Sequence, residues 1–165
     1  CLFQCCRNFF RIIDMENIYI SIVGIVYLFM LFIPNMIWVK NTPENYDSSH
    51  ENKILLMFER FGEVLVCCFG VIMFETMDWN IFVLVSFVFM LMYEGYWIQY
   101  FKSEKKLSDF YCSYLKIPLA GATLPVIAFL ILGLSQGHWL LVFSTIILGI
   151  GHIGIHREHF LEIKR

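Results

Sequence analysis

The sequence predicts an all-α protein, a bundle of five transmembrane helices, and three observations lead to this class. First, 59% of the 165 residues are hydrophobic and only 16% are charged, with a mean hydropathy of +0.68, above the range of soluble domains. Second, the hydrophobic residues form five long segments, each near the roughly 20 residues that a helix needs to cross a bilayer. Third, lysine and arginine are concentrated on one side of these segments.

The five expected spans follow one another through polar or short connections. The first two comprise residues 17–39 and 54–75, with a polar loop between them. The third, residues 81–98, follows a turn so short that it must run antiparallel to the second. A charged loop leads to the last two spans, residues 117–134 and 138–156, which form another tight hairpin.

The start of the chain is treated apart from the membrane domain. The first methionine is Met15, immediately before the first hydrophobic segment. Residues 1–16 therefore have a doubtful status, and residues 17–165 form a single domain. A lipidated Cys1 would normally precede a polar tether, whereas Leu2 and Phe3 follow here.

Positive charge orients the bundle and also bears on its partners. With five crossings, the side that contains the C-terminus holds nine lysines and arginines: Lys40, Lys53, Lys102, Lys105, Lys106, Lys116, Arg157, Lys164 and Arg165. The other side holds only Arg7 and Arg11. Because positive residues are retained in the cytoplasm, we expect a cytoplasmic C-terminus and an external N-terminus. Since the net charge is −2 and no basic cluster is present, the expected partner is the lipid bilayer, not nucleic acid.

The second span carries three charged residues, Glu59, Arg60 and Glu63, within its first three turns. Each ionised side chain near the middle of a bilayer costs about 2.5–3.5 kcal/mol, so neighbouring helices must supply partners. Glu59 and Glu63 share a helix face, and Arg60 can pair with Glu63 three residues on. A pair that neutralises itself and only fixes helix packing is the alternative to a functional role.

The other spans place their polar residues in the same, cytoplasmic half. The fourth also contains two prolines, which free backbone carbonyls that need partners inside a bundle. We therefore predict a polar cavity that opens to the cytoplasm and binds a small ligand, an ion or a lipid head group. Its expected residues are Asn35, Glu59, Arg60, Glu63, Glu94, Thr123, His152 and His156.

A divalent metal is one candidate occupant of this cavity. Glu59 and Glu63 are four residues apart on one helix, and His152 and His156 are four apart on another. Together they could supply oxygen and nitrogen ligands within a bundle. The histidines could equally hydrogen-bond to Glu59 or Glu94.

Three further functions stay open at this point. A membrane-embedded enzyme acting on a lipid or isoprenoid would use the carboxylates and histidines as acids and bases. A subunit of a small transporter would use the proline-interrupted fourth span and, with so few spans, would require a homo-oligomer. A structural or assembly protein would pair every ionised group and leave no cavity.

The segments FERFGE, GATLPVIAF and GIGHIGIH resemble those of an uncharacterised family of small bacterial multi-pass membrane proteins. The similarity extends over most of the chain from Met15 onward. It implies a location in the bacterial inner membrane and no particular activity.

Overall fold

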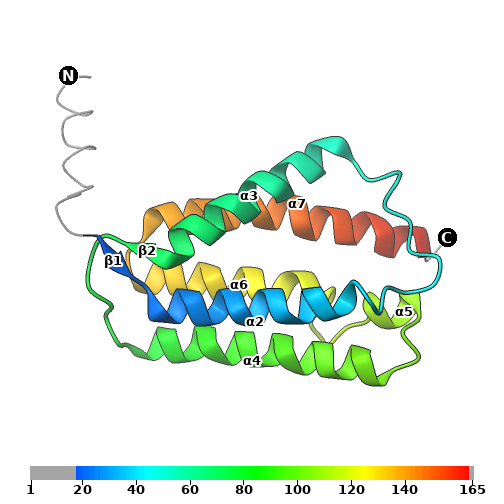
Figure 1. Ribbon diagram of the computed structural model, residues 1–165, viewed down its shortest axis with the longest axis horizontal. Helices are drawn as coiled ribbons and strands as arrows, with labels where there is room; N and C mark the ends of the chain where they lie inside the picture. Colours follow the sequence, from blue (N-terminus) through cyan, green and yellow to red (C-terminus); the bar gives the residue numbers. More distant parts are fainter. Residues whose placement is uncertain (1–17, 164–165) are drawn as a thin grey trace.

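In residues 18–163, the chain forms five long helices that run along the longest axis of the molecule in alternating directions (Figure 1). This computed structural model describes residues 18–163; the N-terminal segment with Cys1, Arg7 and Arg11, and the last two residues, lie outside that range. The all-α class is confirmed. The long helices are α2 (Ile22–Trp38), α3 (Lys53–Val71), α4 (Ile81–Lys102), α6 (Ala120–Ser135) and α7 (Trp139–Ile163).

Some helices extend beyond the expected spans, whereas α3 ends before its expected span does. Helices α4 and α7 continue into polar sequence, to Lys102 and Ile163. In contrast, α3 ends at Val71, where the chain enters strand β2 (Ile72–Met73), which pairs antiparallel with β1 (Tyr19–Ile20). Strands of two residues have no periodicity, so hydropathy assigned these residues to the first two spans.

Three helices begin at side-chain caps that are visible in the sequence. Ser21, Asn52 and Asn80 each accept a backbone N–H from the first turn of the following helix, at 2.9–3.0 Å. Such caps satisfy donors that have no partner within the helix. Helix α6 begins differently, after Leu119 in the left-handed conformation with a φ of 49°.

The helices pack in a continuous sequence, with α3 along α7, α7 along α6, and α6 along α4. Helix α2 lies against α4, and hydrogen bonds hold α2 and the residues just after it to α4. These bonds join Tyr27 Oη to Ser86 Oγ at 2.6 Å, Asn35 Nδ2 to Tyr93 Oη at 3.0 Å, and Tyr100 Oη to the carbonyl oxygen of Asn41 at 2.7 Å.

Helix α2 meets α3 where Gly24 faces Gly70. A Cβ atom on Gly24 would lie 1.6 Å from the carbonyl oxygen of Gly70, so the two backbones approach at a distance that only glycine permits there. From this point the two helices diverge toward the end of the bundle that carries α5 (Leu107–Phe110) (Figure 1). The divergence positions the cleft described below.

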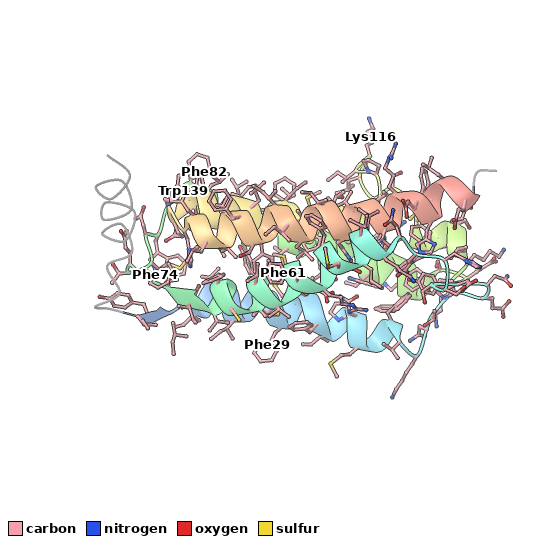
Figure 2. The ribbon with its side chains drawn as sticks, turned by 90° about the horizontal axis from the view of Figure 1, so that it is seen from above. Phe29, Phe61, Phe74, Phe82, Lys116 and Trp139 are labelled. Carbon is pink, nitrogen blue, oxygen red and sulfur yellow. The ribbon has the colours of Figure 1, made fainter. Side chains whose placement is uncertain are left out.

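The two ends of the bundle differ in polarity. All the described lysines and arginines except Arg60 lie in residues 39–53, residues 102–119 or the last turns of α7, which meet at one end. Nitrogen and oxygen atoms gather at this end in Figure 2. At the other end, a pair of hydrogen bonds of 2.8 Å joins Asp78 to Gln136 and ties the two short turns together.

The sides of the bundle are apolar. Phe29, Phe61, Phe82 and Trp139 lie on four different helices, and each is 57–61% exposed (Figure 2). Within residues 18–163, two helices, α4 and α7, are long and apolar enough to cross a membrane, while α2 and α6 are apolar but shorter. This surface points to membrane association.

Candidate functional site

A cleft of about 630 Å³ lies between α2, α3, α6 and α7. Its lining includes most of the residues that the sequence assigned to a polar cavity: Asn35, Glu59, Arg60, Glu63, His152 and His156. The four helices and the loop at residues 39–52 therefore contribute to one site, together with Trp97 of α4 and Phe110 of α5. Glu94 and Thr123 do not line it.

The cleft is polar at one end and apolar at the other. Its polar end is formed by the loop residues Ser48 and Glu51 together with Glu59 and the two histidines. Its apolar end is lined by Leu31, Val66, Val126, Phe129 and Leu148. The α3 residues of the lining extend from Leu56 to Cys67, which corresponds to roughly 16 Å along a helix axis.

The central polar contact joins α3 to α7. His152 Nδ1 and Glu59 Oε1 are 2.5 Å apart, with 26% and 12% of the respective side chains exposed. The helices come this close because residue 151 is a glycine. A Cβ atom at this position would lie 2.2 Å from the backbone nitrogen of Glu59. A neutral imidazole that donates from Nδ1 presents Nε2 as an acceptor, so the carboxylate both orients the ring and sets its tautomer.

Two further histidines extend this contact along one face of α7. The ring centroids of His152 and His156 are 4.6 Å apart, and the ring of His156 lies 5.6 Å from that of Tyr111. His159 Nε2 lies 3.2 Å from Oε1 of Glu51 in the loop. Sequence reasoning missed this second histidine–glutamate pair, although the i, i+4, i+7 spacing of the three histidines indicates one helix face.

The loop at residues 39–52 covers the polar end. Tyr46 Oη donates a hydrogen bond to Glu51 Oε1 at 3.4 Å. Burial, together with the nearby carboxylates of Glu51 and Glu59, raises the pKa of Tyr46 to about 12. The phenol therefore stays protonated and serves as a donor. No periodic pattern marks a loop residue of this kind, so the sequence alone did not identify it.

The predicted pairing of Arg60 with Glu63 is present at the edge of the cleft. Arg60 Nη1 lies 3.2 Å from Glu63 Oε2, and the side chains are 71% and 44% exposed. The pair is thus more open than the Glu59–His152 contact. The Arg60–Glu63 pair lies on α3 in the part of the cleft where α2 and α3 diverge.

Two of the predicted site residues lie outside the cleft. Thr123 Oγ1 donates within its own helix region, to the carbonyl oxygens of Pro118 and Leu119 at 3.1 Å each. Glu94 lies on α4, whose inward face is occupied by the buried aromatic residues Tyr93 and Trp97. Because successive helix residues are about 100° apart, Glu94 lies beside that face, where it is half-buried and outside the cleft. Both predictions relied on depth along the helix axis, which does not specify the direction of a side chain.

The proposed metal ligands do not converge. Among residues 18–163, no three histidine, cysteine, aspartate or glutamate side chains are close enough together to hold a metal ion. Glu63 pairs with Arg60, whereas Glu59 pairs with His152. The four expected ligands are therefore divided between separate contacts, and the donor set fits hydrogen-bonded pairs better than a metal centre.

No protein-family model, curated protein or solved structure matches this chain. The resemblance to a family of small bacterial membrane proteins accordingly stays a prediction. The cleft is the feature from which a function can be inferred.

Proposed function

We propose that this chain is a five-span membrane protein that binds an amphipathic small molecule, such as a lipid, in the cleft between α2 and α3. The cleft itself is the observation that carries the proposal. Its polar end would hold the head group of the ligand, and its apolar end would hold part of the tail. A water-soluble ligand would leave the apolar walls without a partner.

The five spans are supported by the surface and by the charges. Exposed hydrophobic side chains occur along the length of α2, α3, α4 and α7. The described lysines and arginines outside α3 gather at one end, which we assign to the cytoplasm. The predicted family resemblance would locate the protein in a bacterial inner membrane.

The ligand would enter sideways from the bilayer. Phe32 and Arg60 line the cleft and are also exposed, one on each of the diverging helices. A lipid could therefore pass between α2 and α3 without leaving the membrane. The head group would then reach Glu59, while the tail would lie against Phe129 and Leu148.

The proposal is tested by filling the apolar end of the cleft. Cys67 lines the cleft, whereas its neighbour Cys68 is exposed and does not. We expect purified wild-type protein to retain a stoichiometric amphiphile in a nonionic detergent. The Cys67→Phe variant should lose it, because the phenyl ring occupies the volume of the tail. Solvent extraction and mass spectrometry measure the retained molecule.

The matched control is Cys68→Phe, which adds the same ring to the outer face of the same helix. It should retain the amphiphile, and circular dichroism verifies that both variants are folded. If the wild type retains no amphiphile above a detergent blank, or if both variants retain it equally, the proposed site is wrong.

A second function, an enzyme acting on the bound amphiphile, is favoured by the Glu59–His152 contact. A histidine oriented by a carboxylate is a common general base. The same extraction tests this function. A His152→Ala variant of an enzyme would retain a chemically different amphiphile, its substrate, whereas a binding protein would retain the same one as the wild type or none.

The transport alternative receives less support. A transporter requires a path of polar groups that continues beyond the cleft to the outside. The hydroxyl groups available for such a path already form hydrogen bonds inside the bundle. Ser144 and Thr145 donate to backbone carbonyl oxygens of their own helix at 2.6 and 2.8 Å. Ser86 is bonded to Tyr27. None of these residues lines the cleft.

A further inference from the structure

We infer that the cleft selects amphiphiles whose head group is a cation, an organic ammonium group attached to a hydrocarbon tail. This inference rests on the proposed function and adds the chemical class of the ligand. It is carried by the charge balance and the aromatic content of the polar end.

The buried carboxylates of the cleft lack a permanent cation. The side chains of Glu51 and Glu59 are each only 12% exposed. In the described part of the chain, the ion-pair partners of these two carboxylates are histidines alone. A histidine is positively charged only when it is protonated, so a neutral ring donates a hydrogen bond but does not balance the charge.

Arginine does not supply the missing charge. Arg60 is the single lysine or arginine in the described lining of the cleft, and it pairs with Glu63 at the exposed edge. The lining thus contains three glutamates and one arginine, which gives an excess of negative charge. Largely buried charges without a permanent countercharge are costly, and a bound cation would reduce that cost.

Aromatic rings stand beside the carboxylates. Trp38, Tyr46, Trp97 and Phe110 all line the cleft. The ring of Trp38 meets that of Tyr46 edge to face and stacks on that of Phe110, with centroid distances of 5.3 Å in both cases, so the three rings form one aromatic cluster in the lining. The faces of aromatic rings attract cations, and tryptophan does so most strongly. Carboxylates and aromatic faces together are typical of sites for alkylammonium groups.

An anionic head group would be repelled at the polar end of the cleft. A phosphate or carboxylate at the polar end would face Glu51 and Glu59 at close range. The guanidinium of Arg60 is the sole permanent cation in the described lining, and it is already engaged. Like charges in a partly buried site repel strongly, so discrimination against anions should be marked.

The experiment compares three brominated amphiphiles with the same chain: ω-bromoundecyltrimethylammonium, ω-bromoundecanol and ω-bromoundecanoate. Bromine quenches nearby tryptophan fluorescence. The protein used carries two substitutions, Trp79→Phe and Trp139→Phe, which remove the two exposed tryptophans. The remaining tryptophan fluorescence then comes from Trp38 and Trp97 in the cleft. We expect saturable quenching by the ammonium compound, with an affinity about tenfold or more above that of the other two.

Glu59→Gln in the same background should weaken binding of the ammonium compound by about tenfold relative to binding of the alcohol. The matched control is Glu75→Gln, which removes an exposed carboxylate outside the cleft and should have no effect. Equal saturable binding of all three amphiphiles, or tighter binding of the anion, would overturn the cationic preference while leaving the proposed function intact. Absence of saturable quenching by any of them would instead overturn the proposed function.

Discussion

At the scale of single residues, burial separates the contacts of two glutamates that look similar in the sequence. Glu59 and Glu63 are one helical turn apart, yet Glu59 is 12% exposed and bonded to His152, whereas Glu63 is 44% exposed and bonded to Arg60. Helix periodicity predicts the second pair, because both partners are on one helix. The first depends on the packing of α3 against α7, so the sequence supplies only the candidates.

The Glu59–His152 contact should contribute measurably to stability. A double-mutant cycle with Glu59→Ala and His152→Ala is expected to show a coupling free energy of unfolding of about 1.5–3 kcal/mol, because the hydrogen bond involves a charged, largely buried group. Denaturant or thermal unfolding in detergent measures it.

The comparison pair for this cycle is Glu104 and Lys106, which form an ion pair on a loop with 76% and 67% of their side chains exposed. Their coupling should be about 0–1 kcal/mol, since water screens exposed pairs. Equal coupling for the two pairs would show that burial does not distinguish the Glu59–His152 contact.

At the scale of helices, glycines determine how closely the elements approach. A Cβ atom on Gly62 would lie 2.4 Å from Cα of Leu148, and one on Gly151 would lie 2.2 Å from the nitrogen of Glu59. Both contacts are made with backbone or with atoms next to it, which cannot move aside easily. They hold α3 against α7 and thereby bring the carboxylate of Glu59 to the histidine.

The substitution Gly151→Ala should therefore be destabilising by about 1–3 kcal/mol, because the added methyl group must push α3 away from α7. Thermal unfolding of the purified protein provides the measurement. Gly149→Ala, on the same helix, places its methyl group 3.1 Å from one side-chain atom of Val126 and should cost much less. A similar loss in the two variants would contradict this account of the α3–α7 contact.

Hydropathy predicted where the long helices lie, but not where each one ends. The five expected spans each overlap one long helix, since runs of apolar residues form helices when they are buried or in lipid. The short elements β1, β2 and α5 were not predicted, because two to four residues have no periodicity to detect.

At the scale of the whole molecule, the alternating helices place their connections at two opposite ends. If all five long helices cross the membrane, residues 40–52 and 103–119 face the cytoplasm, and the turn at residues 74–80 faces the outside. This topology is the part of the proposal that a labelling experiment can test directly.

The two sides of the membrane can be distinguished with single cysteines, introduced one at a time at Thr76, Ser49 and Ser113. The chain's own cysteines are first replaced by alanine. In intact spheroplasts, a membrane-impermeant maleimide should label Thr76→Cys. It should label Ser49→Cys and Ser113→Cys only after lysis, because the bilayer separates these loops from the reagent. Labelling of all three positions before lysis would rule out the five-span topology.

The amino-acid sequence by itself determined the all-α class, the approximate positions of five helices, the polar character of one end and six residues of the cleft lining. These properties follow from hydropathy and from helix periodicity, which are local. The tertiary structure decided which side chains converge: it paired Glu59 with His152, left Glu94 outside the cleft, and added Tyr46 and Glu51, the latter paired with His159. It did so because contacts between helices depend on rotation and on close approach at glycines, and neither is encoded in the position of a residue along its own helix.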